Sequence, residues 1–515
     1  MKNRTLESLL ASIEQSPDGP HVCAFFDFDG TIISGFSAIA YLRQQLTRGD
    51  FSLAELGKMA AAMTRFGLGD MGFSAMMAAT MQFMRDTPEQ DFVEFSELMY
   101  RKQIARAIYP ESRALIEAHQ AKGHTVAIVS SATPYQVRPA ATDLDIEEIR
   151  CTELEVENGV FTGRVVQPTC FGPGKVVAAQ SIADNVGGTL ATSFFYTDST
   201  DDIELLESVG HPVALNPNSR LKEIAEQRDW PKAAFSSRGR ASLTRWARSI
   251  AATGSLATSF VAALPILALT GSRRKMQNFS YALFAETASA LIGLDLNVRG
   301  EEHVWAQRPA VFIFNHQSKA DVVIILQLLR KDLAGVGKKE IRNMPIIGQV
   351  MQLGGAVLID RQNAKNAIAV MQPLVDVMRE EGKSVVMAPE GTRTLTPKLN
   401  PFKKGAFHLA MQAGVPIVPI VIHNSIDVAP KGDFVFRPAT VEVDVLPPVD
   451  TSAWRKETID EHVKEVREMF LVALGQRAPS TASTRPKRKA GTAKRKKKKK
   501  VTRKTVKLAS PDAKR

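Results

Sequence analysis

The sequence predicts two successive α/β domains followed by a disordered basic tail. Short apolar runs alternate with helix-like stretches up to about residue 235, as in a parallel sheet wrapped by helices. A second mixed α/β stretch runs from about Asn297 to Gly475. The chain of 515 residues is too long for one ordinary domain, and its content of 44% apolar and 23% charged residues is ordinary for a folded protein.

Three apolar runs in the first domain are predicted to be buried parallel strands. They cover residues 22–26, 125–129 and 193–196, and each ends in polar residues. Open α/β sheets bind ligands just beyond the carboxyl ends of their strands, so these polar residues are candidates for a functional site. Between about residues 36 and 108 the chain is rich in Met, Ala and Leu at helical spacing, which predicts a helical cap over the sheet.

An uncharged segment of 24 residues, 249–272, lies between the two domains. It is long enough to cross a bilayer, but small residues, hydroxyls and Pro265 dilute its apolar character. Arginines flank both of its ends, so loop charge does not orient it. A full membrane span, an interfacial or re-entrant helix and a buried soluble helix stay open, and membrane contact of some kind is favoured.

These patterns divide the chain into four parts. The first domain is expected at 1–235, a linker with the membrane-associated segment at 236–280, the second domain at 281–475 and the tail at 476–515. The tail holds seventeen Lys and Arg residues and one acid, Asp512, which leaves 49 basic and 53 acidic residues elsewhere. Such a low-complexity segment buries too little apolar area to fold. Its charge predicts binding to polyanions, with anionic lipid favoured over nucleic acid, or a solvated tail without a fixed partner.

The cysteines and the N-terminus favour a cytoplasmic setting. Cys23, Cys151 and Cys170 are far apart and odd in number, which argues against a disulfide framework or a zinc site. The N-terminal residues mix acidic and polar side chains with leucines and lack an apolar core, so no signal peptide is expected.

Two aspartates follow the first predicted strand in the sequence FFDFDGT. Because side chains alternate along a strand, Asp27 and Asp29 are expected on the same side. One carboxylate can then attack phosphorus while the other exchanges a proton with the leaving group. A turn after a strand often contains Asp and Gly, so this motif alone is weak evidence.

Three later segments add the charges that such a reaction needs. Strand 125–129 ends at the hydroxyl of Ser130, Lys175 follows a tight CFGPG turn, and TDSTDD supplies Asp198 and Asp202. A phosphate beside an attacking carboxylate needs positive charge, which Lys175 and a Mg²⁺ ion would supply. The predicted metal ligands are Asp27, Asp29, Asp198 and Asp202.

In order and spacing, these four motifs resemble those of the haloacid dehalogenase superfamily, in particular its phosphoserine-phosphatase-like branch (subfamily IB), over about residues 18–235. The resemblance implies a Rossmann-like domain with a cap and a Mg²⁺-dependent phosphatase activity. It implies that Asp27 is the nucleophile that forms an aspartyl-phosphate and that Asp29 is the general acid and then the base. The other implied roles are phosphoryl binding by Ser130 and Lys175, Mg²⁺ binding by Asp198 and support of that site by Asp202.

The second domain carries a histidine and an aspartate in the sequence FNHQSKAD. Asp321 lies five residues after His316, and a turn into a helix between them would bring the carboxylate to the imidazole. That contact would set the imidazole tautomer and raise its basicity toward a hydroxyl substrate. No Ser or Cys is placed as a nucleophile beside His316, so direct attack by a substrate hydroxyl is the simpler mechanism.

Basic residues and backbone amides farther along the chain predict a phosphate cradle. VGKKEIRNMPIIG carries Lys338 and Lys339, GGAVLIDR ends in Arg361, and VPIVPIVI is a buried strand. VVMAPEGTR adds four candidates for substrate binding, which are Glu390, Gly391, Thr392 and Arg393.

Together these blocks resemble the glycerolipid acyltransferase family, which contains the 1-acylglycerol-3-phosphate acyltransferases, over about residues 280–475. The resemblance implies that His316, oriented by Asp321, deprotonates the free glycerol hydroxyl of a lysophosphatidate-like acceptor. The oxygen would attack an acyl thioester from acyl-CoA or acyl carrier protein, while Arg361 and the 390–393 loop bind the phosphate. The family usually has Phe where Ala388 stands, which bears on pocket shape and acyl preference.

The sequence therefore predicts a bifunctional enzyme of phospholipid synthesis at the cytoplasmic face of the cell membrane. Its predicted partners are lysophosphatidate, an acyl thioester, a phosphomonoester and a membrane surface with anionic lipid. One alternative is a phosphatase that acts mainly on phosphoserine or a lipid phosphate. Another is a membrane- or nucleic-acid-binding scaffold led by the tail.

Overall fold

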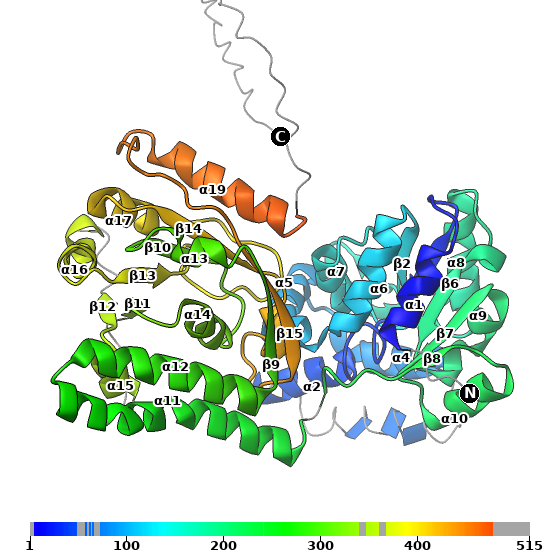
Figure 1. The fold of residues 1–515 in the computed structure, drawn as a ribbon. Helices are drawn as coiled ribbons and strands as arrows, with labels where there is room; N and C mark the ends of the chain where they lie inside the picture. Colours follow the sequence, from blue (N-terminus) through cyan, green and yellow to red (C-terminus); the bar gives the residue numbers. More distant parts are fainter. Residues whose placement is uncertain are drawn as a thin grey trace, which may run out of the picture. The chain divides into compact units, whose positions relative to one another are not determined.

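A six-stranded parallel sheet is the framework of the first domain in the computed structural model (Figure 1). The structure describes residues 5–48, 57–58, 61–62, 64–65, 73–239, 241–338, 347–359 and 367–476. The strands of this sheet are β1 (Cys23–Phe26), β2 (Thr125–Val129), β3 (Glu148–Arg150), β6 (Phe194–Thr197), β7 (His211–Leu215) and β8 (Lys232–Ala233). Their order is β3-β2-β1-β6-β7-β8, so the three strands predicted from the sequence are neighbours.

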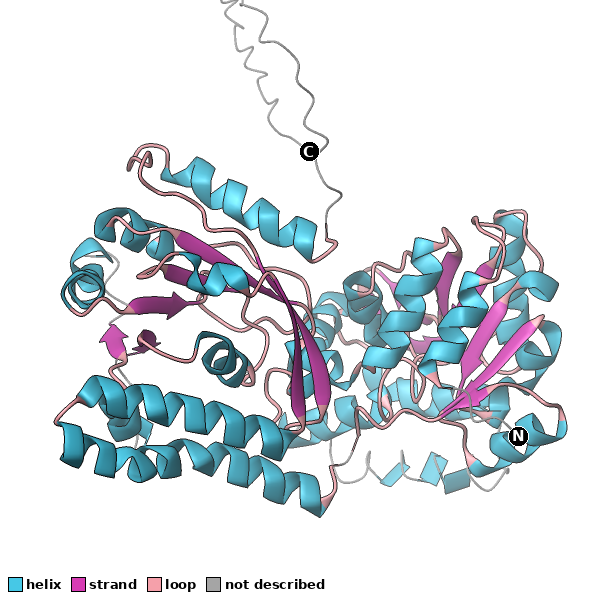
Figure 2. Ribbon diagram, in the orientation of Figure 1, coloured by secondary structure: helices cyan, strands magenta, loops and turns pink. Residues whose placement is uncertain are grey.

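Helices cover both faces of this sheet (Figure 2). β1 is buried throughout because its side chains alternate between two apolar clusters, Ala24 and Phe26 on one face and Cys23 and Phe25 on the other. The prediction of a parallel sheet wrapped by helices is confirmed. These helices are α1 (Leu6–Glu14), α6 (Pro110–Ala121), α7 (Pro134–Asp143), α8 (Pro173–Asn185), α9 (Ile203–Ser208) and α10 (Ser219–Gln227).

Helices also occupy the segment after the first motif, where the sequence predicts a cap. They include α2 (Ser37–Arg48), α4 (Phe73–Met81), α5 (Glu89–Met99) and the π-helical turn η2 (Tyr100–Ile104). An antiparallel hairpin, which the sequence analysis did not anticipate, packs against this segment through Phe161 and Met84. The hairpin consists of β4 (Leu154–Glu157) and β5 (Val160–Val165).

A seven-stranded mixed sheet forms the second domain. Its strands are β9 (Leu294–Arg299), β10 (Val311–Phe314), β11 (Leu333–Lys338), β12 (Val357–Ile359), β13 (Ser384–Met387), β14 (Ile417–Ile422) and β15 (Ala439–Val445). The order is β12-β11-β13-β10-β14-β15-β9, in which β14 and β15 pair antiparallel and the other neighbours pair parallel. Phe312 and Phe314 face one apolar cluster and Val311 and Ile313 the other, so β10 is buried on both faces.

Two long helices, α11 (Leu243–Thr270) and α12 (Arg273–Ile292), lie side by side in the second domain (Figure 1). Phe260 and Ala263 of α11 belong to the same apolar cluster as Phe284 of α12 and Phe312 of β10. One side of the uncharged segment predicted within a linker therefore belongs to this domain's core, and the other side is exposed. The boundary expected at residue 280 falls inside α12.

The other helices of the second domain are shorter. They are α13 (Glu302–Ala306), α14 (Asp321–Leu329), α15 (Ile347–Leu353), α16 (Ala367–Glu380), α17 (Gly405–Ala413), α18 (Ser425–Val428) and α19 (Ile459–Ala473). The predicted disordered tail lies, from residue 477 onward, outside the described residues.

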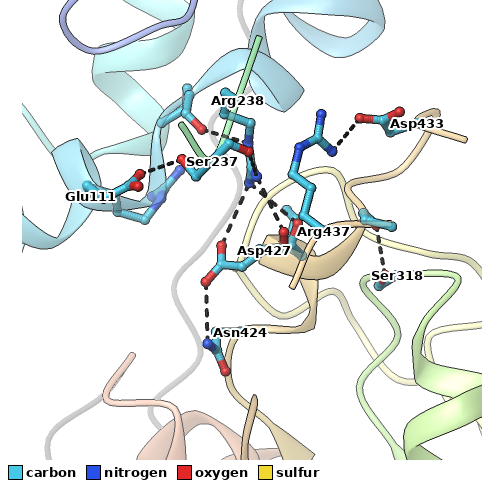
Figure 3. Close-up of polar contacts among 12 residues, drawn as sticks. Glu111, Ser237, Arg238, Ser318, Asn424, Asp427, Asp433 and Arg437 are labelled. Atoms are coloured by element: carbon cyan, nitrogen blue, oxygen red, sulfur yellow. Dashed lines mark hydrogen bonds and ion pairs between the residues drawn. The ribbon is translucent and has the colours of Figure 1, made fainter. Parts of the chain in front are cut away.

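Arg238 anchors the segment that joins the two domains (Figure 3). Its buried guanidinium donates hydrogen bonds to the carbonyl oxygens of Ile108 at 3.1 Å and Ile426 at 3.4 Å, and it lies 3.7 Å from a carboxylate oxygen of Asp427. Burial lowers the pKa of Arg238 to about 10, while Asp427 acts in the opposite direction. Residues Met1–Arg477 accordingly form one compact unit.

Candidate active sites

The first candidate site lies at the carboxyl ends of β1 and β6. Asp27 directly follows β1 and Asp198 directly follows β6, and these strands are parallel neighbours, so the two carboxylates meet at one edge of the sheet. Gly30 makes this approach possible. Its φ is +76°, and a Cβ at this position would lie 2.1 Å from Oδ2 of Asp198.

Lys175 is a buried lysine on α8 that reaches the same edge. Its Nζ lies 2.9 Å from Oδ1 of Asp27 and 2.8 Å from the carboxylate of Asp202, which also accepts a hydrogen bond of 2.6 Å from the Thr197 hydroxyl. Burial alone would lower the pKa of Lys175, but Asp202 and Asp27 outweigh it and raise the pKa above its ordinary value. The lysine therefore stays cationic beside Asp27. It is buried, whereas most charged side chains are exposed to solvent.

Asp29 has the properties of a proton donor and acceptor. The main-chain N–H of Ser37 donates to its Oδ1 at 2.7 Å, and the Ser37 hydroxyl donates to its Oδ2 at 3.0 Å. Burial raises the pKa of Asp29 to about 7, and the neighbouring charge of Asp27 contributes to the rise. A carboxyl group with a pKa near neutrality can serve as general acid and then as general base.

Ser130 lies at the end of β2, the other neighbour of β1, and is buried. Its hydroxyl oxygen accepts a hydrogen bond of 3.3 Å from the main-chain N–H of Ala132. All six residues predicted for phosphoryl chemistry are thus carried to one end of the sheet by β1, β2, β6 and α8. They are Asp27, Asp29, Ser130, Lys175, Asp198 and Asp202.

The negative charge gathered at this edge of the sheet suits a divalent cation. Burial raises the pKa of Asp198 to about 8, and the charges of Asp27 and Asp202 contribute to the rise. A cation would relieve this repulsion. Mg²⁺ commonly binds through one or two carboxylates and fills its other positions with water and phosphate oxygens, so Asp27 and Asp198 suffice as protein side-chain ligands.

The four predicted metal ligands differ in how many protein donors they contact. The carboxylates of Asp29 and Asp202 each accept two hydrogen bonds from protein donors, whereas that of Asp27 accepts one, from Lys175. Among the residues that the structure describes, no group of three or more His, Cys, Asp or Glu side chains is arranged to hold a metal ion. Asp27 and Asp198 are thus the carboxylates with more of their oxygens left for another ligand.

The second candidate site is a histidine–aspartate pair that follows β10. Nδ1 of His316 lies 2.7 Å from Oδ2 of Asp321, the fully buried first residue of α14. The same carboxylate oxygen accepts hydrogen bonds of 2.9 Å from the main-chain N–H groups of Gln317 and Ser318, which hold it in place. Because the carboxylate accepts from Nδ1, Nε2 is left as the basic nitrogen of the ring.

Contacts from distant segments fix the loop that carries His316. Asn315 exchanges two hydrogen bonds of 2.7 Å with the main chain of Ile422 at the end of β14. The Ser318 hydroxyl donates to the carbonyl oxygen of Ala429 at 2.7 Å, a contact drawn in Figure 3. Sequence analysis did not single out Asn315 and Ser318, although both belong to the motif that contains His316. Their partners are more than 100 residues away, so the motif gave no indication of these contacts.

The predicted phosphate loop joins the same site. Glu390 is buried and accepts hydrogen bonds from the main-chain N–H groups of His316 at 2.8 Å and Asn400 at 3.0 Å, and Thr394 donates its main-chain N–H to the His316 carbonyl at 2.8 Å. Glu390 therefore positions the loop instead of presenting a free carboxylate to substrate. Gly391, with φ of +73°, lies against Lys403, while Thr392 is exposed and Arg393 is half-buried. Two other predicted substrate-binding residues, Lys339 and Arg361, lie outside the described residues.

Comparison with known proteins identifies a family for each domain. Residues 295–423 match the acyltransferase family, and residues 24–207 match the haloacid dehalogenase-like hydrolase family. The 1-acyl-sn-glycerol-3-phosphate acyltransferase alpha of Homo sapiens is 34% identical over 215 residues, which are 42% of this chain and 75% of that protein. The chain belongs to the 1-acyl-sn-glycerol-3-phosphate acyltransferase family. In this chain the acyltransferase domain follows an N-terminal haloacid dehalogenase-like domain.

Two further proteins are similar to parts of this chain. The 1-acyl-sn-glycerol-3-phosphate acyltransferase of Limnanthes alba is 37% identical over 181 residues, which are 35% of this chain and 64% of the relative, so the chain spans somewhat less than two thirds of that protein. The crystal structure of the 1-acyl-sn-glycerophosphate acyltransferase of Thermotoga maritima has a TM-score of 0.39 and 24% identity, and the match covers 46% of this chain and 97% of that one.

Proposed function

We propose that this chain is a bifunctional enzyme that acylates 1-acyl-sn-glycerol 3-phosphate to phosphatidate and separately hydrolyses a phosphomonoester. The observation that carries the acyltransferase assignment is the 2.7 Å contact of His316 with the buried Asp321, beside the loop that contains Arg393. The names of the curated relatives support this reaction. The hydrolase assignment rests on the carboxylates and lysine at the ends of β1 and β6.

In the proposed acyl transfer, Nε2 of His316 acts as the general base. Nε2 takes the proton of the acceptor's hydroxyl group as its oxygen attacks the carbonyl carbon of the acyl thioester. The tetrahedral species then collapses, the carbon–sulfur bond breaks, and the departing thiolate receives the proton from the imidazolium. Asp321 holds the ring in its tautomer and stabilises the imidazolium. The acyl donor is acyl-CoA or the acyl thioester of acyl carrier protein.

Phosphate release uses the carboxylates of the first site. Asp27 attacks phosphorus, and Asp29 gives its proton to the oxygen of the departing alcohol. A water molecule then attacks the aspartyl-phosphate while Asp29 takes up a proton, which returns Asp27 as a carboxylate. Lys175 and Ser130 bind phosphoryl oxygens during both steps. Mg²⁺ bound by Asp27 and Asp198 would supply additional positive charge next to the phosphoryl group.

Incubation of the purified full-length protein with lysophosphatidate, oleoyl-CoA and Mg²⁺ tests both assignments in one reaction. We expect phosphatidate to form, and we expect phosphate to be released from members of a panel that includes phosphoserine, lysophosphatidate and phosphatidate. Excess chelator should stop phosphate release and leave phosphatidate formation intact. If no phosphatidate forms from either acyl-CoA or acyl carrier protein donors, the acyltransferase assignment is wrong. The panel also separates phosphoserine from lipid phosphates as the hydrolase substrate.

We further propose that α11 binds the membrane surface at the cytoplasmic face. It is a helix long and apolar enough to cross a bilayer. One side is buried against the domain, whereas Ile250 is 67%, Val261 65% and Leu264 47% exposed, and these three share one side of the helix. An apolar strip of this kind suits insertion of one side into the lipid surface better than a full span. The basic tail would add attraction to anionic lipid.

Replacing Ile250 and Val261 together by glutamate should weaken binding to vesicles of phosphatidylglycerol and phosphatidylcholine by at least about tenfold, because each side chain contributes roughly 1.5 to 3 kcal/mol when fully buried. Flotation of the full-length protein with the vesicles measures this. The matched control is Val177→Glu on α8, where the valine is 63% exposed in the other domain. High salt should weaken only the electrostatic contribution of the basic tail to vesicle binding. Equal flotation of the double variant and the control would disprove the proposed contact.

A further inference from the structure

Donors from other parts of the chain hold the end of α18. The last four carbonyl oxygens of a helix have no partner within it, so those of this four-residue helix need donors from outside. Arg238 donates to the carbonyl oxygens of Ile426 at 3.4 Å and Asp427 at 3.5 Å (Figure 3). The main-chain N–H of Arg437 donates to that of Val428 at 2.8 Å. Arg238 therefore fixes the end of α18 from the segment that joins the two domains.

Ser318 connects this helix end to the pair formed by His316 and Asp321. Its hydroxyl donates to the carbonyl oxygen of Ala429, the residue directly after α18, and accepts the main-chain N–H of Ala320 at 3.0 Å. The main-chain N–H of Ser318 donates to Oδ2 of Asp321, the same oxygen that contacts His316. A displacement of the helix end would therefore move the loop that orients the imidazole.

The other contact of Arg238 lies in the hydrolase domain. Its Nε donates to the carbonyl oxygen of Ile108, which pairs with Ile33 in an antiparallel bridge. The main-chain N–H of Ser34 also donates to the carbonyl oxygen of Ala107 at 2.8 Å. Ile33 and Ile108 both belong to the apolar core of that domain. One planar guanidinium group thus joins a core segment of the first domain to a support of the second site.

The loop after β13 is held by the hydrolase domain as well. Leu395 packs against the apolar cluster of that domain, and Nζ of Lys398 lies 2.8 Å from Oδ1 of Asp145. Thr394, next to Leu395, donates its main-chain N–H to the carbonyl oxygen of His316. Both segments that support His316 therefore contact groups outside the acyltransferase domain.

We propose that Arg238 is a positioning residue for acyl transfer, which fixes the end of α18 and thereby the loop of His316. This inference rests on the proposed acyltransferase function and adds that the hydrolase domain helps to hold the general base in place. Acyl transfer then depends on the contact between the domains and not on phosphate release. A misplacement of about 1 Å can cost roughly 100-fold in rate, so a small shift of this loop is enough to be measured.

Steady-state acyl transfer from oleoyl-CoA to lysophosphatidate by the full-length protein tests the proposal. Arg238→Ala should lower kcat about tenfold and change KM by less than about twofold, because Arg238 acts on the orientation of the base and not on substrate binding. Asp427→Asn removes the carboxylate that faces the guanidinium at 3.7 Å and leaves Arg238 and Ile108 unchanged. It should lower kcat about threefold and leave phosphate release at the wild-type rate. If Arg238→Ala does not fold, Asp427→Asn carries the test.

Arg308→Ala is the matched control. Its guanidinium likewise donates to three main-chain carbonyl oxygens, and burial lowers its pKa to about 10. One of these oxygens belongs to Leu329, at the end of α14 remote from Asp321. The control should keep kcat within about twofold of the wild type. Equal losses of kcat in Arg238→Ala and Arg308→Ala would overturn the inference, because they would show a general effect of removing a buried arginine.

A double-mutant cycle tests whether Arg238 acts through Ser318. Ser318→Ala removes the hydroxyl that donates to the carbonyl oxygen of Ala429. In that background, Arg238→Ala should lower kcat by less than a further twofold or so, because the connection to the loop is already broken. A further loss of about tenfold would show that Arg238 acts independently of Ser318, which contradicts the proposal.

Hydrogen exchange tests the same connection without acyl transfer. The main-chain N–H groups of Gln317 and Ser318 donate to Asp321, so their exchange reports on the loop. Exchange of the peptide that contains them should be about tenfold faster in Arg238→Ala than in the wild type and in Arg308→Ala. Unchanged exchange would refute the inference. Failure of the proposed function is a different result, in which the wild type transfers no acyl group, and hydrogen exchange then decides the inference alone.

Discussion

His316→Ala should lower kcat/KM for acyl transfer to lysophosphatidate by roughly 10³-fold and leave phosphate release unchanged. The expected loss has the size of a general-base contribution, because alanine removes the only nitrogen placed to take the hydroxyl proton in the proposed mechanism. Both rates are measured on one preparation of the full-length protein, so the hydrolase activity reports on folding.

His423 provides a matched control for this experiment. It also follows a central strand, β14, and its Nε2 lies 2.8 Å from a carboxylate oxygen of Asp444. The exposed fractions of the two histidine side chains are nearly equal, 25% for His316 and 24% for His423. However, the carboxylate of Asp444 also pairs with Arg299. His423→Ala should retain acyl transfer. Equal losses in the two variants would show that a histidine–aspartate pair at a strand end is needed for structure and not for proton transfer.

Asp27→Asn should lower phosphate release by roughly 10³-fold or more and leave acyl transfer intact. Asparagine keeps the shape of the side chain but is a far weaker nucleophile than a carboxylate. It also removes a charge that Lys175 contacts at 2.9 Å. Phosphate release from the best substrate of the panel measures the loss. Trapping of an acid-stable phosphoenzyme that hydroxylamine cleaves should succeed with the wild type and fail with the variant.

Asp201→Asn is the control for the hydrolase site. Asp201 is exposed, whereas the adjacent Asp202 is buried against Lys175. The control should release phosphate at the wild-type rate, because the structure places only Asp202 in the charge cluster. Phosphate release by Asp27→Asn within tenfold of the wild type would contradict the assignment of Asp27 as nucleophile. A parallel fall in acyl transfer would instead indicate that the two domains depend on each other.

Much of the candidate chemistry could be predicted because it follows short-range rules. The five-residue spacing of His316 and Asp321 predicts their contact, since a loop that turns into a helix returns the carboxylate to the ring. Strand alternation also predicts that Asp27 and Asp29 share a side; β1 ends at Phe26, before both residues, so this stays a prediction.

Other features could not be predicted from local patterns. The uncharged segment 249–272 has a periodicity compatible with a span, a surface helix or a core helix. Only its packing beside α12 shows that Phe260 faces the core while Val261 is exposed. The role of Glu390 as a support for the His316 loop was likewise not predicted, because its partners are main-chain N–H groups of distant segments.

The sequence by itself determined which chemical groups stand at the ends of the strands and the order in which they occur. The tertiary structure alone decided which of them meet. Lys175 and Asp27 are 148 residues apart, and Lys431 and Arg393 are 38 residues apart. The physical reason is that side-chain periodicity describes an element and its nearest turns, whereas contacts across such separations depend on strand order and on how helices pack onto the sheet.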